Sequence, residues 1–202
     1  MKRRSLGLLL ALLFALSAHA QGEAPDVLVS RVSNEVLQIL QESSTTPGSA
    51  EVIARVKEKI LPHFDFPRMT ALATGIGWRS ASPAQQAQLV EQFRTLLVRT
   101  YSSALSKYRD QTLEFLPSRE SADKKKVIVR SLLKQPGAQS IAVDYRMAGG
   151  SGDWKVYDVV VDGVSLVTTY RDAFAAEVRS NGIEGLIRML GDKNATLAED
   201  AQ

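Results

Sequence analysis

Apolar residues recur every three or four positions in the first half of the chain and every second position in much of the second half. The first spacing predicts amphipathic helices, and the second predicts strands with two distinct faces. The change falls just after Asp110. Helices are therefore predicted first, then a run of strands, then helices again, an order typical of α+β proteins.

Cap and breaker residues delimit the helices of the first half. Ser82 is suited to an N-cap, Pro83 to the first helical position, and Gln85 to the third position of a capping box. The predicted helices cover residues 25–42, 51–61, 64–75 and 82–108. The last is the longest, and its apolar stripe consists of Leu89, Phe93, Leu97, Tyr101, Leu105 and Tyr108.

Four strands are predicted after the long helix, over residues 112–116, 125–133, 140–148 and 154–161. Short loops join them, which favours an antiparallel meander. Alternation places Ile141, Val143, Tyr145 and Met147 on one face of the third strand. In the fourth strand Trp154, Val156, Asp158 and Val160 share a face, and the other face is also apolar. A strand that is apolar on both sides is predicted to be central in its sheet.

The chain is predicted to end in two helices and a disordered tail. Asp162-Gly163 breaks the fourth strand, and Ser165 is suited to cap a helix over 166–179. Asn181-Gly182 then ends this helix and separates it from a last short helix, 183–190. A tail follows from Gly191. The predicted fold is α+β, with a curved four-stranded antiparallel sheet and the helices packed on one face.

The first twenty residues have the features of a secretory signal peptide. Lys2, Arg3 and Arg4 precede an apolar run over 6–16, and Ala18-His19-Ala20 fits a cleavage site. The apolar run is too short to span a bilayer. The expected organisation is a signal peptide over 1–20 that is cleaved after Ala20 on export, one domain over 21–190 and a tail over 191–202.

Removal of the signal peptide changes the interpretation of charge. The whole chain has 25 basic and 22 acidic residues; three of the basic residues lie in the leader, which leaves 22 of each. A neutral chain gives no electrostatic reason to expect nucleic-acid binding. There is no cysteine, so neither a disulfide framework nor a lipoprotein anchor is expected. The short basic run at 124–126 fits a solvated strand end or a docking patch for an anionic membrane or acidic partner.

Candidate chemistry is sparse. Outside the leader the only histidine is His63, which with no cysteine excludes the usual zinc sites. Neither a G-x-S-x-G nucleophile elbow nor a phosphate-binding P-loop occurs in the chain. Asp158 lies on a predicted apolar face, where an unpaired carboxylate is costly. It is expected to form a buried ion pair with an arginine such as Arg79 or Arg171; the alternative is a general base in a cavity.

Two motifs carry a family resemblance. The segment WKVYDVVVDGVSLVTTYR, residues 154–171, resembles the W-K-x-x-D-x-x-x-x-G-V-S-L-x-x-x-Y-R signature of the MlaC, or toluene-tolerance, family of periplasmic phospholipid carriers. Gly75, Trp78-Arg79, Gln86, Phe93 and Thr100-Tyr101 resemble the family's G-x-x-W-R and Q…F…T-Y pattern. The resemblance spans roughly residues 27–190.

Sequence alone does not distinguish a filled core from a hollow one, but the resemblance implies a pocket for acyl tails between sheet and helices. The implied lipid-binding residues are Phe93, Leu97, Tyr101, Leu105, Val127, Val129, Ile141, Val143, Tyr145, Val167, Tyr170 and Phe174. It also implies phospholipid as cargo, no cofactor or metal, and a monomer that exchanges lipid with an inner-membrane ABC complex bearing an MCE-domain ring and an outer-membrane lipoprotein–porin complex.

Two other functional classes remain open at this point. One is a small envelope hydrolase or isomerase that uses Asp158 as its base. The other is a structural adaptor that binds only protein. Bound lipid in the purified protein distinguishes the carrier from both.

Overall fold

The computed structural model describes residues 23–43, 49–106, 111–120, 125–149 and 153–199, without the side chains of 103–106 and 118–120. The predicted signal peptide therefore lies outside the described residues. The helices are α1 (Pro25–Glu42), α2 (Ala50–Ile60), α3 (Phe66–Thr74), α4 (Gly77–Ser80), α5 (Pro83–Ser106) and α6 (Arg171–Glu199), with short 3₁₀ turns η1 (Leu61–His63) and η2 (Thr168–Tyr170). Within the described residues none of these helices is both long enough and apolar enough to cross a bilayer.

The strands form one antiparallel sheet in chain order, β1-β2-β3-β4-β5. They are β1 (Thr112–Glu120), β2 (Lys126–Lys134), β3 (Ile141–Ala148), β4 (Lys155–Val161) and β5 (Val164–Ser165). The predicted α+β class is confirmed, with one strand more than expected. The added strand is β5, which pairs with β4 through a two-residue turn in which Asp162 and Gly163 both have positive φ, 47° and 84°.

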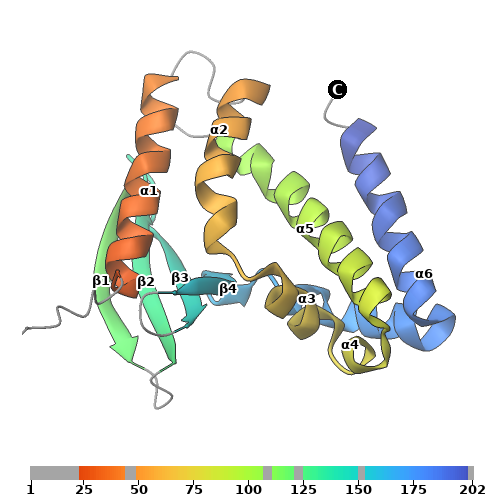
Figure 1. Ribbon diagram of the computed structural model, residues 1–202. Helices are drawn as coiled ribbons and strands as arrows, with labels where there is room; N and C mark the ends of the chain where they lie inside the picture. The colour runs from red at the N-terminus through yellow and green to blue at the C-terminus, as the bar shows by residue number, and fades with distance from the viewer. Residues whose placement is uncertain (1–22, 44–48, 107–110, 121–124, 150–152, 200–202) are drawn as a thin grey trace, which may run out of the picture.

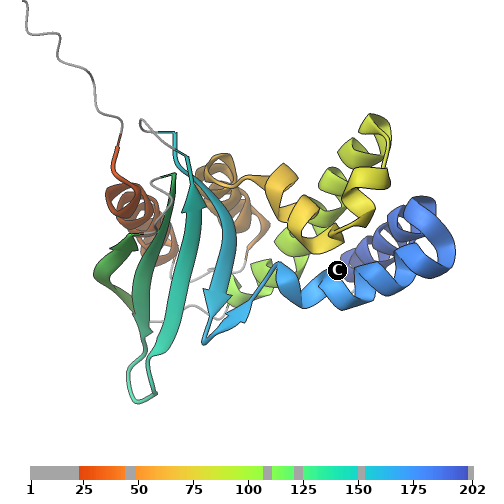
Figure 2. The same cartoon turned by 90° about the horizontal axis from the view of Figure 1, so that it is seen from below.

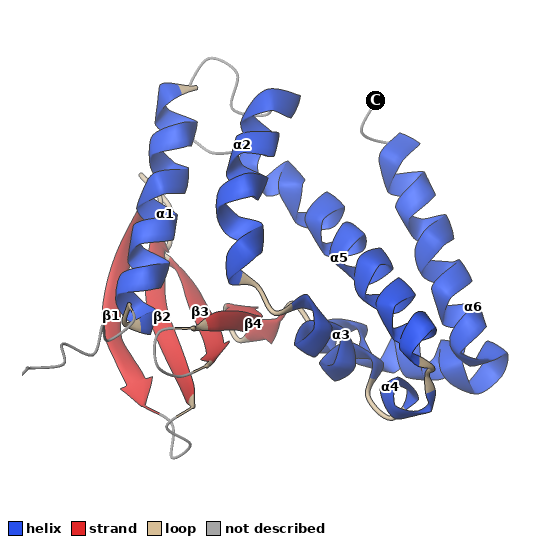
Figure 3. Ribbon diagram, in the orientation of Figure 1, coloured by secondary structure: helices blue, strands red, loops and turns tan. Residues whose placement is uncertain are grey.

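The helices occupy two regions (Figures 1 and 3). Helix α1 lies over one face of the sheet and α2 packs beside it, whereas α3, α5 and α6 form a lobe beyond the β4 side of the sheet, as Figure 2 shows. The long helix α5 therefore lies beside the sheet rather than over it. Its stripe is paired with α6 and α3 instead, because these helices present enough apolar surface to bury it.

The buried residues divide accordingly into separate clusters. One cluster fills the helical lobe and includes Phe93, Phe174 and Val167. The rings of Phe93 and Phe174 meet edge to face with centroids 5.3 Å apart, a favoured aromatic geometry. A second cluster joins α1 to the sheet and includes Val127 and Val129, and a third joins α1 to α2.

The cap signals around α5 are confirmed. The Ser82 hydroxyl accepts from the Gln85 amide at 3.3 Å, while the Gln85 side chain accepts from the Ser82 amide at 2.8 Å. This reciprocal pair satisfies two amide groups at the helix end that have no partner within the helix. The Gln85 side chain also donates to Glu184 of α6, which holds the start of α5 close to that helix.

Two segments extend further than predicted. β1 passes through Pro117, and its pairing with β2 shifts between Leu116 and Arg119, so the proline sits at an irregularity of an edge strand, where its missing N–H is tolerated. The predicted disordered tail is wrong for 191–199, which continue α6 after a break at Gly182. Leu190 and Asn194 are buried, and the Asn194 amide donates to the Gln92 carbonyl of α5 at 2.9 Å.

A bulge in β4 reassigns the faces of that strand. Met147 pairs with Val156, but its neighbour Arg146 pairs with Asp158, so Tyr157 is the extra residue. Val156 therefore shares the face of Met147, and Asp158 shares the opposite face with Arg146. The strict alternation that placed Val156 and Asp158 on one face is wrong, because the inserted residue reverses the side-chain direction beyond it. β4 is also not the central strand. It is the second strand from one edge of the sheet, because only the two-residue β5 lies beyond it.

Candidate functional site

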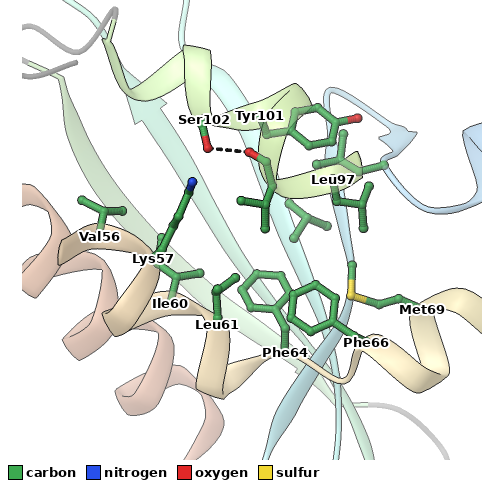
Figure 4. Close-up of a pocket in the computed structure, with 13 residues that line it drawn as sticks. Val56, Lys57, Ile60, Leu61, Phe64, Phe66, Met69, Leu97, Tyr101 and Ser102 are labelled. Carbon is green, nitrogen blue, oxygen red and sulfur yellow. Dashed lines mark hydrogen bonds between the residues drawn. The ribbon is translucent and has the colours of Figure 1, made fainter. Parts of the chain in front are cut away.

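A cavity of about 250 Å³ lies where α2, α3 and α5 meet β4. Figure 4 shows its lining side chains converging from these elements. The lining residues are Val56, Lys57, Ile60, Leu61, Phe64, Phe66, Met69, Leu97, Val98, Tyr101, Ser102, Val159 and Leu166. We call it the α2–α5 cavity. Its wall is almost wholly apolar, which suits hydrocarbon rather than a polar substrate.

A second cavity of about 200 Å³ lies between α1 and the sheet. Its lining residues are Leu28, Val29, Val32, Ser33, Val36, Leu37, Ile60, His63, Phe64, Leu113, Tyr145, Met147 and Val156. We call it the α1–sheet cavity. The apolar stripe of α1 thus does not close completely onto the strands, and a hollow remains beside the buried cluster.

Ile60 and Phe64 line both cavities, so they form the wall between them. The backbone holds the segment that carries Phe64 on the sheet. Phe64 forms a β-bridge with Val156, and the Asp65 amide donates to the Val156 carbonyl at 2.9 Å. Phe64 also stacks on Phe66 with ring centroids 5.9 Å apart. The side chain of Asp65 caps α3 by accepting from the Arg68 amide at 3.0 Å. Backbone and cap hydrogen bonds therefore fix the position of this wall.

Three titratable side chains of the walls, those of Tyr101, Tyr145 and His63, are shifted toward their uncharged forms. Burial, with a contribution from Tyr170, raises the pKa of Tyr101 to about 12. Burial also raises the pKa of Tyr145, although the Ser131 and Ser33 hydroxyls partly oppose this. Burial and the nearby Arg31 charge lower the pKa of His63. Each shift has burial as its main cause, so at neutral pH these three groups add no charge to the cavities.

The structure brings together only some of the predicted lipid-binding residues. Leu97 and Tyr101 line the α2–α5 cavity, and Tyr145 lines the α1–sheet cavity. Tyr170 is a neighbour of the lining, because it packs with Tyr101 against the buried cluster of the helical lobe and contributes to the raised pKa of Tyr101. The side chain of Leu105 lies outside the described residues.

The other predicted lining residues lie elsewhere. Phe93, Val167 and Phe174 fill the core of the helical lobe, and Val127 and Val129 are buried in the cluster between α1 and the sheet. Ile141 and Val143 belong to β3 but line neither cavity. None of these seven residues borders either cavity.

Most of the wall was missed by the sequence prediction. The missed residues come chiefly from α1, from α2 and from the segment 60–69 that follows it. The available signals were the α1 stripe that includes Leu28 and Val32, and the apolar pair Phe64 and Phe66. Periodicity marked these positions as apolar, but it did not show that they border empty space.

Asp158 forms the predicted buried ion pair, but with a different arginine. Its carboxylate is 1 % exposed and lies 3.1 Å from Arg146 Nη1. It also accepts from the Ser165 hydroxyl at 2.8 Å and from the Val167 amide at 3.3 Å. Arg171 instead donates to the Leu72 carbonyl at 3.0 Å, and Arg79 lies in α4. The partner is Arg146 because the β4 bulge places Asp158 opposite it.

The same geometry removes Asp158 from the cavities. Val156 and Val159, which line them, lie on the other face of the sheet. A general base has to reach its substrate, and this carboxylate is enclosed by its own hydrogen-bond donors. Among the described residues no cluster of three or more histidine or carboxylate side chains is placed to hold a metal ion.

Fold and site together define a class: an α+β binding protein in which an antiparallel sheet and its helices enclose adjoining apolar cavities. Residues 30–192 match the family model described as MlaC protein. The chain therefore belongs to the MlaC family. Members of this family are phospholipid-binding transport proteins and not enzymes.

Individual relatives agree with this assignment. The chain is 25% identical over 171 residues to the "Intermembrane phospholipid transport system binding protein MlaC" of Haemophilus influenzae, covering 81% of this chain and 79% of that protein. It is 30% identical over 104 residues to the "Toluene tolerance protein ttg2D" of Pseudomonas putida, covering 52% of this chain and 48% of the relative.

A solved structure has the same fold. It is the phospholipid-binding protein of Ralstonia solanacearum in complex with a phospholipid, which superposes with a TM-score of 0.78 at 36% identity. The match covers 87% of this chain and 99% of that one.

Proposed function

We propose that this protein is a periplasmic carrier that binds a phospholipid by its acyl tails and shuttles it between inner- and outer-membrane complexes, which maintains outer-membrane lipid asymmetry. The observation that carries the proposal is the pair of adjoining apolar cavities. Membership of the MlaC family and the phospholipid bound to the Ralstonia solanacearum relative support it. The lipid is cargo, and no cofactor is required.

The physical chemistry of tail burial limits what such a carrier does. Each methylene removed from water contributes about 0.8 kcal/mol, so a free lipid in water is driven strongly into the cavities. Methylenes in a bilayer are already out of water, so the cavities offer little advantage over a membrane. The direction of lipid transfer must then come from docking partners that stabilise an open form of the carrier.

The partners proposed for this step are the inner-membrane ABC complex with its MCE-domain ring and the outer-membrane lipoprotein–porin complex. The carrier is proposed to meet them as a monomer after its signal peptide, 1–20, is removed. No second function is favoured, because the described cavities contain no carboxylate that could serve the hydrolase or isomerase alternative.

The direct test is to purify the mature protein from its own periplasm and analyse it by native mass spectrometry and by lipid extraction. A phospholipid bound in a defined ratio is the expected result. After delipidation the protein should take up phospholipid from detergent and deliver it to acceptor vesicles. A protein that carries no lipid, and binds none when offered it, would exclude the carrier function.

A further inference from the structure

Among the described residues, Lys57 is the one charged residue that lines the α2–α5 cavity. It comes from α2 and is half-buried. Figure 4 shows its amino group directed across the cavity toward Ser102 of α5. Its aliphatic stem lies among apolar lining residues such as Val56 and Ile60. An apolar stem that carries a terminal charge suits a boundary between hydrocarbon and water.

The neighbouring cations of α2 are paired with carboxylates, whereas Lys57 has no such partner within the part of the chain that the structure describes. Arg55 lies 3.1 Å from Glu42, and Lys59 lies 3.6 Å from Glu35. Among the described residues no carboxylate oxygen lies within 4.0 Å of the Lys57 ammonium. A cation at the edge of a low-dielectric cavity is stabilised when an anion comes within contact.

A role in helix stability does not account for this placement. Lys57 and Lys59 both lie in the last turn of α2, where a positive charge interacts favourably with the helix dipole. Either side chain supplies that charge while directed to solvent. The dipole therefore explains why a lysine stands in this turn, but it does not explain why Lys57 is directed over the cavity.

We propose that Lys57 binds the phosphate of the phospholipid whose tails enter the cavities. The proposal rests on the proposed carrier function and adds to it the chemical group that is recognised at the cavity mouth. A phosphodiester is an anion with several acceptor oxygens, and an ammonium offers three donors. The site thereby selects a lipid with a phosphate over a neutral lipid with the same tails, and it accepts different groups beyond the phosphate.

The test compares two lipids that differ only in the phosphate-containing headgroup. Delipidated protein is offered dioleoylphosphatidylglycerol and dioleoylglycerol in competition at 0.15 M salt, and the bound ratio is measured by native mass spectrometry. Lys57→Gln should lower the preference for the phospholipid about fivefold, the upper end for a partly exposed ion pair. Lys57→Arg should stay within about twofold of the unchanged protein, since both cations bind phosphate.

Lys59→Gln is the matched control, because it removes the same charge from the same helical turn without touching a cavity wall. It should leave the preference within about twofold of the unchanged protein. Glycerophosphoglycerol, the headgroup without tails, should not displace the lipid at millimolar concentration, which distinguishes a lipid phosphate from a free phosphate.

Four results would overturn the inference. They are an unchanged preference in Lys57→Gln, an equal loss in Lys59→Gln, an equal loss of both lipids, and displacement by the tail-less headgroup. In all four the unchanged protein still binds lipid, so the carrier function stands. Binding of neither lipid by the unchanged protein would instead overturn the carrier function together with this inference.

Discussion

The guanidinium of Arg146 and the carboxylate of Asp158 lie 3.1 Å apart on the face of the sheet opposite the two cavities. The two residues are exact partners in the β3–β4 register only because β4 bulges at Tyr157. Ser165 and the Val167 amide complete the hydrogen bonds to the carboxylate. The Ser165 hydroxyl also accepts from the Thr168 amide at 2.9 Å. One carboxylate therefore links the sheet to the turn that leads into α6.

Asp158→Asn should destabilise the protein without abolishing lipid binding by the folded fraction. The amide loses the charge-assisted bonds from Arg146 and presents a donor to the Val167 amide. The expected loss in the free energy of unfolding is about 1–3 kcal/mol, measured by urea unfolding of the delipidated protein.

Asp144→Asn is the control for this substitution. Asp144 faces Arg130 on the same side of the sheet, but the pair is 4.0 Å apart and its side chains are 37 % and 31 % exposed. Its loss should change stability by less than about 0.5 kcal/mol. Normal stability of Asp158→Asn together with lost turnover of a substrate would contradict the structural role.

Val159→Trp should reduce lipid content with little effect on the lipid-free protein. Val159 lies on the β4 wall of the α2–α5 cavity, so the indole would occupy space that tails otherwise fill. The melting temperature of the delipidated variant should stay within a few degrees of the unchanged protein, equivalent to about 1 kcal/mol. Extracted phospholipid per protein should fall clearly.

Val164→Trp serves as its control, because Val164 is 57 % exposed on β5 and lines neither cavity. It should leave lipid content unchanged. If Val159→Trp were strongly destabilising with normal lipid content, the α2–α5 cavity would be ordinary core that closes on its own side chains.

Phe64→Ala should join the two cavities, because Phe64 forms part of the wall between them. Removal of the ring is expected to cost about 2–4 kcal/mol, since Phe64 is only partly buried. The composition of bound lipid should shift toward longer or bulkier tails, measured by mass spectrometry of the extract.

Phe115→Ala is the matched control for Phe64→Ala. It removes a ring that packs between α1 and the sheet but lines neither cavity. It should lower stability without altering the distribution of tail lengths. An identical distribution in Phe64→Ala and the unchanged protein would mean that the wall does not limit the tails.

Alkaline pH should weaken the protein partly through Tyr101. Its pKa is about 12 in the folded state, against about 10 for a solvated tyrosine. The folded form therefore holds this proton more tightly than the unfolded form. The resulting stability is fully present below pH 10 and is lost as pH rises through 12.

The measurement is urea unfolding of the unchanged protein and of Tyr101→Phe at pH 9 and pH 11.5. The unchanged protein should lose more stability over this interval, because the phenylalanine variant has no proton to release at this position. Equal losses in both proteins would show that the Tyr101 hydroxyl titrates as if it were solvated.

Much of the element order was predictable because local patterns determine local structure. Caps, breakers and periodicity identified α1, α2, α3 and the start of α5 at Ser82 to within a residue or two. The change from a period of 3.6 to a period of 2 identified the four long strands. Chain-wide composition excluded disulfides, and the motif over 154–171 identified the family.

What the sequence did not determine depends on contacts between distant segments. No local pattern shows that the stripe containing Phe93 packs on α6 rather than on the sheet. Nor does any local pattern show that 191–199 stays helical, because the burial of Asn194 against Gln92 is a contact over 102 positions.

The β4 bulge is the clearest example. Alternation of side chains is a local rule, and one inserted residue reverses it beyond Tyr157. Only pairing with β3 shows this, and it decides both the partner of Asp158 and the residues that face the cavities.

The sequence by itself therefore determined the α+β class, the helix and strand segments and the apolar character of the walls, because these follow from each residue and its near neighbours. Only the tertiary structure decided which apolar residues fill a core and which border a cavity. A leucine in a core and a leucine beside a cavity differ in nothing but the positions of residues far along the chain. Ile60 and Phe64 form a shared wall because α1, α5 and β4 come near them in the fold and leave space on both sides.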